Sequence, residues 1–139
     1  MIREIENLNR IIGIRVYQTP WMLRGSGICL PGIGIFIHSS IHEKAKLGII
    51  QHEYGHFLDY KFGSNADQKR LLGSRLLGFY FLIGIPSLLN LVPILNRIPA
   101  FSGPHRTFWT EIRANKLAKA HFGETLAEDF HRYFPSQQA

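Results

Sequence analysis

Two histidines and a glutamate near the middle of the chain have the types and spacing of a metal site beside an acid–base group. They are His52, Glu53 and His56, in the pattern HExxH. Residues four apart lie on one face of a helix, roughly 5–6 Å apart at Cβ, so two imidazoles can reach one ion. Zinc binds imidazole nitrogen at about 2.0–2.1 Å and lowers the pKa of its bound water to roughly 7. Glu53, one step round the helix, can miss the metal and still accept the proton of that water.

A catalytic zinc site needs a third protein ligand and an open fourth position. In the longer pattern HExxHxxGxxH the third ligand would fall at position 62, which is Phe62, so this arrangement is excluded. The best remaining candidate is Glu111, four residues before Asn115. Asn115 can accept a hydrogen bond from a ligand imidazole and orient it. His105 and Asp67 are the rival third ligands.

Hydrolysis by a metal-activated water also needs a group that stabilises the negative oxygen that develops on the substrate. This group is commonly a histidine, tyrosine or arginine. We favour His105, because it lies in a predicted loop shortly before Glu111. The other candidates are His121, Arg113, Tyr60 and Tyr80.

A long central helix is predicted to carry the HExxH segment. Ser40 and Glu43 have the spacing of a capping box, so the helix should begin at Ile41 and run to about Lys61. Its apolar residues lie on more than one face, which is typical of a buried helix. A later helix, over about Thr107 to Ala120, would carry Glu111.

The N-terminal third is predicted to supply a small sheet. Apolar spacing indicates a helix from Ile2 to Ile11 and a strand from Ile14 to Gln18. Gly27–Leu30 and Ile33–His38 flank a Pro-Gly turn and are expected to form a hairpin. We therefore predict one α+β domain over residues 1–139, with a small antiparallel sheet packed on a helical bundle.

Residues 76–96 contain no charged side chain. Their number would suffice for a bilayer span of about 20 residues. Pro86 and Pro93 oppose a straight span, because each would break or kink a helix. Two interpretations stay open: a wall of the core beside the metal helix, or a monotopic or re-entrant membrane contact.

Charge and cysteine content limit the classes of partner and compartment. The formal net charge is +6, but the basic residues are scattered and no nucleic-acid-binding module is recognisable, so we expect no nucleic-acid partner. Cys29 is the only cysteine, and the charged N-terminus lacks an apolar signal-peptide core. We expect a cytoplasmic protein, with association to a membrane surface as the alternative.

The two motifs together resemble those of the gluzincin metallopeptidases. In that group, HExxH on one helix is completed by a glutamate from a later helix. The second motif, Glu111-x-x-Ala114-Asn115, is most similar to the ExxAD version found in CaaX-processing and heat-shock membrane peptidases and in the compact minigluzincins. The resemblance covers about residues 33–120, and Asn115 stands where the pattern has Asp.

The resemblance implies a zincin-like fold and a set of roles. His52, His56 and Glu111 would bind Zn²⁺, and Glu53 would be the general base. Residues 32–38 would form a sheet-edge strand that aligns an extended peptide by β-augmentation. The substrate-aligning residues of that strand would be Ile33, Gly34, Ile35 and Phe36.

These expectations lead to a zinc-dependent endopeptidase acting on a peptide or protein substrate. One alternative is a non-catalytic zinc-binding scaffold, or a latent precursor whose cleft is filled by its C-terminal segment. Another is a membrane-associated protease that processes proteins. The sequence predicts no oligomeric state.

Overall fold

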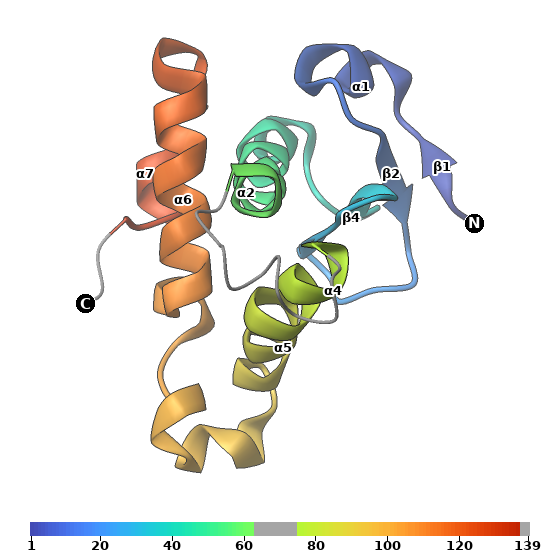
Figure 1. The fold of residues 1–139 in the computed structure, drawn as a ribbon. Helices are drawn as coiled ribbons and strands as arrows, with labels where there is room; N and C mark the ends of the chain where they lie inside the picture. The colour runs from blue at the N-terminus through green and yellow to red at the C-terminus, as the bar shows by residue number, and fades with distance from the viewer. Residues whose placement is uncertain (63–74, 137–139) are drawn as a thin grey trace.

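The computed structural model describes residues 1–62 and 75–136. Over these residues the chain is α+β, with a small four-stranded sheet packed against the long helix α2 and a second long helix, α6, on the other side of α2 (Figure 1). In chain order the strands are β1 (Arg3–Glu4), β2 (Val16–Thr19), β3 (Gly27–Leu30) and β4 (Gly34–His38).

The sheet is mixed, and the prediction of an antiparallel sheet was wrong. The strand order is β1-β2-β4-β3. The predicted hairpin is present as antiparallel β3 and β4, but β4 also pairs in parallel with β2. The loop after β2 carries the chain past the inner position, so β3 takes the edge and β4 fills the gap. At the N-terminus, β1 replaces the first turn of the predicted helix, and α1 spans only Glu6–Ile12.

Apolar residues from the sheet and α2 form the core under the HExxH helix. Alternate strand residues point to one face, which places Val16, Ile35 and Ile37 against α2 with no exposed area. Helix α2 spans Glu43–Phe62 and begins two residues later than predicted. The Ser40 hydroxyl bonds the ring of His38 at 2.6 Å, and the predicted capping box does not form. The sheet therefore fixes α2 along one side.

Helix α6 spans Trp109–Phe122 and crosses α2 at close range. At the crossing, Gly55 faces the backbone of Ala114, and a Cβ built on Gly55 would lie 2.1 Å from the Ala114 carbonyl oxygen. No side chain fits there without moving a helix. The close approach brings the residues flanking Gly55 on α2 next to the first turns of α6.

Replacing Gly55 by Ala should separate these helices and lower the free energy of unfolding by about 1–3 kcal/mol or more. Gly48→Ala is the matched control, because the new Cβ would lie 3.7 Å from its nearest neighbours, an ordinary contact. It should leave stability unchanged or raise it by up to about 1 kcal/mol through helix propensity. Urea unfolding followed by circular dichroism measures both. Equal losses in the two variants would contradict the close crossing.

The uncharged segment folds into five helical stretches, of which the first three follow one another without a break. They are α4 (Arg75–Phe79), the π-helix η2 (Tyr80–Gly84), α5 (Ile85–Asn90) and the 3₁₀ helices η3 (Pro93–Arg97) and η4 (Pro99–Phe101). The helical run continues past Pro86, which directly follows the π-helix η2, so Pro86 does not end the helix. None of the helices in the described ranges is long and apolar enough to cross a membrane.

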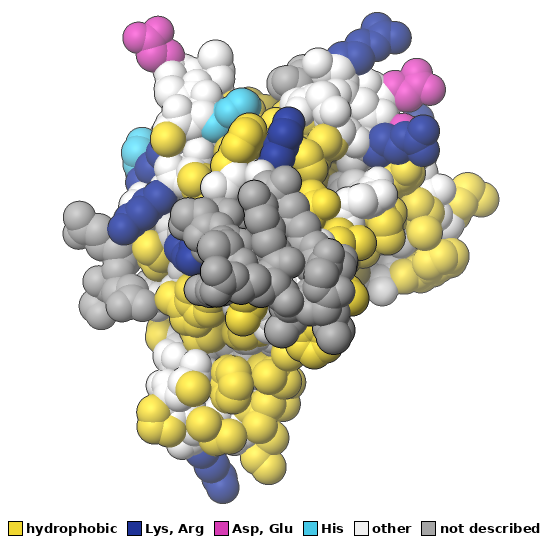
Figure 2. All heavy atoms as spheres, viewed as in Figure 1, with side chains coloured by type: hydrophobic (Ala, Val, Ile, Leu, Met, Phe, Trp, Pro, Cys, Tyr) yellow, Lys and Arg dark blue, Asp and Glu magenta, His cyan; other side chains and the backbone are white. Residues whose placement is uncertain are grey.

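The apolar side chains of this segment divide between core and surface. Phe79 and Ile83 are buried, whereas many of their neighbours are exposed. Figure 2 shows hydrophobic side chains covering much of the lobe formed by α5 and the pieces that follow it. The remaining elements are η5 (His105–Thr107), η6 (Gly123–Thr125) and α7 (Phe130–Tyr133).

Candidate metal centre

Two helices bring three donor groups to one buried point. His52 and His56 come from α2, and Glu111 comes from the first turn of α6, where the helix dipole favours a negative charge. The Oε2 atom of Glu111 lies 2.8 Å from Nε2 of His52 and 3.1 Å from Nε2 of His56. All three residues are less than one tenth exposed. One carboxylate oxygen thus faces two imidazole nitrogens at the same time.

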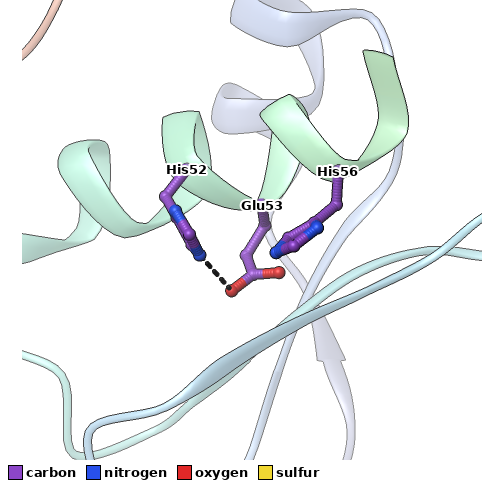
Figure 3. A group of neighbouring side chains, drawn as sticks. All are labelled: His52, Glu53 and His56. Carbon is purple, nitrogen blue, oxygen red and sulfur yellow. Dashed lines mark ion pairs between the residues drawn. The ribbon is translucent and has the colours of Figure 1, made fainter. Parts of the chain in front are cut away.

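A second carboxylate lies beside this cluster. Figure 3 shows that His52, Glu53 and His56 point to the same side of α2, with Glu53 between the two rings. The ligating atoms of these three residues lie within 4.8 Å of one another, which is close enough to hold a metal ion. Oε1 of Glu53 is 3.9 Å from Nε2 of His52, so Glu111 is the nearer carboxylate. The two carboxylates therefore differ in position: Glu111 is in direct contact with the imidazoles, whereas Glu53 lies farther from them.

Hydrogen bonds fix which nitrogen of His52 faces the cluster. The amide of Asn115 donates to the carbonyl oxygen of Pro135 at 2.5 Å, which leaves Oδ1 to accept from His52 Nδ1 at 2.6 Å. Nε2 of a neutral His52 then carries a lone pair and faces an anionic oxygen. That contact is favourable only with a proton or a cation between the atoms. The observed contacts of 2.8 Å and 3.1 Å are hydrogen-bond distances, and two imidazoles with a carboxylate are donors that suit zinc.

Electrostatics in the cluster oppose the effect of burial. Burial alone would lower the pKa of His56, but the carboxylate of Glu111 outweighs it and raises this pKa to about 9. Burial would likewise raise the pKa of Glu111, whereas His56 and His52 hold it well below its usual range. The cluster without metal is therefore an ion pair that holds a proton. A divalent ion can replace that proton.

Burial is the largest influence on Glu53, although its carboxylate also forms a long ion pair with His52. Burial raises the pKa of its carboxyl above the usual range, against the lowering effect of His52 and His56. The backbone N–H of Cys29 on β3 donates to the carboxylate. Gly27, on the same strand, lies close to this side chain, because a Cβ built on it would be 3.0 Å from Glu53. The sheet thus positions this carboxylate directly.

His105 lies next to the cluster in the neutral form. Asn90 donates from Nδ2 to the carbonyl oxygens of Phe101 and Gly103, so its Oδ1 accepts from His105 Nδ1 at 2.9 Å. Nε2 of His105 lies 3.4 Å from Oε1 of Glu111. Burial lowers the pKa of His105. Near neutral pH its Nε2 is therefore a lone-pair donor, and it can stabilise a developing oxyanion only after it gains a proton.

Several residues of the site were not predicted from the sequence. The Ser87 hydroxyl donates to Oε1 of Glu111 at 2.7 Å, and Asn90 orients His105. The ring of Phe134 stacks on His52, with centroids 4.6 Å apart. Polar side chains inside the uncharged segment 76–96 were the available signal for Ser87 and Asn90. Nothing in the sequence pointed to Phe134.

The other predicted candidates have different partners. Arg113 pairs with the buried Asp59 at 2.6 Å, and the hydroxyl of Tyr80 donates to the Pro31 carbonyl. The rings of His121 and Tyr60 pack against other aromatic rings. Asp67 lies outside the described residues. Among the predicted oxyanion-stabilising groups, His105 contacts Glu111, with its Nε2 3.4 Å from Oε1.

The predicted substrate strand was wrong. Gly34, Ile35 and Phe36 belong to β4, and Ile33 immediately precedes it. Because β4 is paired on both sides, its backbone is not free to bind a peptide. The free edge belongs to β3. Along an antiparallel pair, residues that bond to the partner strand alternate with residues that do not. The hydrogen bond from the His38 N–H to the Ser26 carbonyl shows which residues of β3 bond to β4. The backbone groups of Gly27 and Cys29 therefore point away from β4, towards the cluster.

Two cavities lie along β3, on either side of the carboxylates. Their volumes are about 660 Å³ and 320 Å³. Both are lined by Gly27, Glu53, His105 and Glu111. The cluster thus lies where two mostly apolar pockets meet, below the free edge of the sheet.

Comparisons of the chain with protein-family models, with curated proteins and with solved structures find no match. The function must therefore be inferred from the chemistry of the site. That site combines two imidazoles with two buried carboxylates.

Proposed function

We propose that this chain is a zinc-dependent endopeptidase of the gluzincin type, with a zincin-like arrangement of its sheet and of helices α2 and α6. The observation that carries the proposal is the difference in position between two buried carboxylates. Glu111 contacts both imidazoles, whereas Glu53 lies between the rings and faces the free edge of β3. A purely structural ion pair would need only the first of them.

The ion would be held by His52, His56 and Glu111. Two imidazole nitrogens and a carboxylate oxygen are the ligand set of many catalytic zinc sites, and three protein ligands leave a position for solvent. When bound, zinc is a Lewis acid that makes a water molecule acidic near neutral pH. Asn115 would keep the lone pair of His52 Nε2 directed at the ion.

Glu53 would act as the general base in hydrolysis. Its raised pKa makes it a stronger proton acceptor than an exposed glutamate, and it would take a proton from water as that water attacks the peptide carbonyl carbon. The same carboxyl could then return the proton to the leaving amine. The Cys29 N–H would hold the carboxylate in position throughout.

The substrate would bind as an extended chain along β3. The backbone groups of Gly27 and the carbonyl oxygen of Cys29 point away from β4 and can bond to an added strand by β-augmentation, while the Cys29 N–H stays bonded to Glu53. Apolar pockets on both sides of the carboxylates would take side chains before and after the cleaved bond. Pockets on both sides favour cleavage within a chain over removal of a terminal residue.

A non-catalytic zinc site is the second candidate, and His105 favours it. The lone pair on its Nε2 lies 3.4 Å from Glu111, so His105 could become a fourth protein ligand and close the shell. Phe134 and Tyr133 also line the larger cavity, where they would compete with a substrate. The number of protein ligands on the ion distinguishes the two candidates.

The test is reconstitution of activity with zinc. The purified chain is stripped with a chelator, loaded with one equivalent of zinc and incubated with an unfolded protein and a quenched fluorescent peptide library. We expect internal cleavage that needs zinc and is lost again on chelation. Tight binding of one zinc without cleavage in either assay would favour the structural site.

Replacing Asn115 by Asp should tighten zinc binding by about tenfold, because a charged acceptor raises the basicity of the His52 ring more than a neutral amide does. Asn115→Ala should weaken binding, since it removes the acceptor altogether. Competition with a fluorescent zinc chelator measures both variants. Weaker binding by the Asp variant would mean that the contact with Pro135 matters more than the charge.

A further inference from the structure

An apolar face covers the segment after α4 and has no covering element in the described residues. Eight of its large hydrophobic side chains are exposed; Ile94 is exposed by 69%, Leu88 by 53% and Phe81 by 51%. We call the following set the apolar face: Phe81, Leu82, Ile85, Leu88, Leu91, Val92, Ile94 and Ile98. Figure 2 shows this lobe as largely hydrophobic, with a basic side chain at its tip.

Internal hydrogen bonds use the amide groups of this segment. Asn96 donates to the carbonyl oxygens of Asn90 and Val92, and Asn90 donates to those of Phe101 and Gly103. The amide groups of these two asparagines are therefore used within the chain and not for bonds with a protein partner. The outer surface offers hydrocarbon and, at its margins, positive charge.

The charges in the segment that carries the apolar face have one sign. Residues 75–110 include three arginines and no Asp or Glu. Arg97 is exposed in this segment, and Arg24 is exposed on the loop between β2 and β3. Arg106 is also exposed, and one of its guanidinium nitrogens donates to the carbonyl oxygens of Arg132 and Tyr133. Leu23 of the loop between β2 and β3 lines the same two cavities as Leu91, which follows α5. The loop therefore lies near the end of α5. An anionic partner would complement this rim.

We propose that the apolar face is a docking surface for an anionic lipid bilayer. The short helices would lie in the interface, with their apolar side chains among the acyl chains and the arginines at the headgroup phosphates. Irregular backbone such as that of η3 is not tolerated deep in hydrocarbon, so insertion is shallow. Both sequence-based interpretations of this segment then hold in part, since one side packs as core and the other contacts lipid.

A second copy of the chain fits this face less well than lipid. Symmetric pairing would bring Arg97 of each copy towards the same interface, where like charges repel. A bilayer meets the apolar side chains and the arginines together.

Docking would place the two cavities beside Glu53 and Glu111 at the membrane surface. Leu88 and Leu91 of the apolar face also line the smaller cavity beside Glu53. If the proposed function holds, the favoured substrates are extended segments that emerge from the membrane. The docking itself requires neither zinc nor hydrolysis, so the two proposals can fail independently.

Vesicle co-sedimentation of the metal-free full chain tests the docking. Vesicles of phosphatidylcholine alone are compared with vesicles that contain three parts in ten of phosphatidylserine, at low and high salt. We expect at least about tenfold stronger partitioning to the anionic vesicles at low salt, and a smaller difference at high salt. No binding to anionic vesicles would overturn the proposal.

Paired substitutions locate the contact. Phe81→Gln with Ile94→Gln should lower partitioning by about tenfold or more, because two side chains no longer enter the acyl region. Ile2→Gln with Ile33→Gln is the matched control; these exposed residues lie outside the apolar face, and we expect less than a twofold change. Circular dichroism checks that both variants are folded.

Two results would overturn the assignment of the face. One is equal loss of vesicle binding in both pairs of variants. The other is a concentration-dependent dimer in light scattering that Phe81→Gln with Ile94→Gln dissociates, in the absence of vesicle binding. That second result would show that the face binds another copy of the chain instead.

Discussion

Glu53→Gln should lower peptide hydrolysis by about a hundred- to ten-thousandfold while the chain still binds one zinc. The amide keeps the size of the side chain and can still accept the hydrogen bond from the Cys29 backbone. It cannot take a proton from water at neutral pH. Because Glu53 is 3.9 Å from His52 and is not the nearer carboxylate, zinc affinity should change little. Initial rates and metal content of the same preparations measure the two effects.

Glu43→Gln is the matched control for this substitution. Glu43 lies on the same helix, in its first turn, and its side chain is 83% exposed, so both rates and zinc content should stay within about twofold of the unmodified chain. Hydrolysis that survives in the zinc-loaded Glu53→Gln chain would remove Glu53 as the base. Loss of zinc in that variant would instead make Glu53 a ligand.

Glu111→Gln should weaken zinc binding by about a hundredfold or more and abolish hydrolysis with it. The total binding free energy of a zinc site is about 10–16 kcal/mol, shared among four ligands, and the amide is a far poorer ligand than the carboxylate. The substitution keeps an oxygen that can accept from Ser87, so the fold should be preserved. Isothermal titration with zinc measures the loss. Unchanged affinity would mean that another group is the third ligand.

The metal-free chain gives an independent test of the same contact. Its His56 has a pKa of about 9, above the value of about 6.5 expected in the unfolded chain, because of Glu111. The resulting stabilisation is complete below the unfolded value and is lost as the pH rises through the folded value. Metal-free wild-type chain should therefore lose stability between about pH 6.5 and 9, and Glu111→Gln should show a smaller loss. The zinc-loaded chain should instead lose stability as the pH falls, since protons displace the metal.

The sequence predicted the residues at the centre of the site better than it predicted the residues that orient them. Helical spacing, a local property of the sequence, predicts that His52 and His56 lie on one face of a helix. Glu111 was predicted from its residue type and its position on a later helix. The partners that orient these groups come from elsewhere in the chain. Ser87 and Asn90 come from the uncharged segment, and Pro135 lies near the C-terminus. No local pattern links them to the ligands.

Strand positions were predicted better than strand neighbours. The runs that form β3 and β4 follow from residue type around the Pro-Gly turn, but the parallel pairing of β4 with β2 depends on the path of the intervening loop. That one pairing moved the expected substrate edge from β4 to β3. Likewise, Ser40 had the type and spacing of a helix cap, yet a histidine two residues earlier took its hydroxyl. Competition for a hydrogen-bonding group is decided by tertiary contacts.

The most direct measurement is anomalous diffraction at the zinc edge from crystals of the zinc-loaded chain. We expect one peak, bonded to Nε2 of His52, Nε2 of His56 and a carboxylate oxygen of Glu111, with solvent in the remaining position. The carboxylate of Glu53 should face that solvent. A peak away from these atoms, or a shell closed by His105, would contradict the proposal of a zinc-dependent hydrolase.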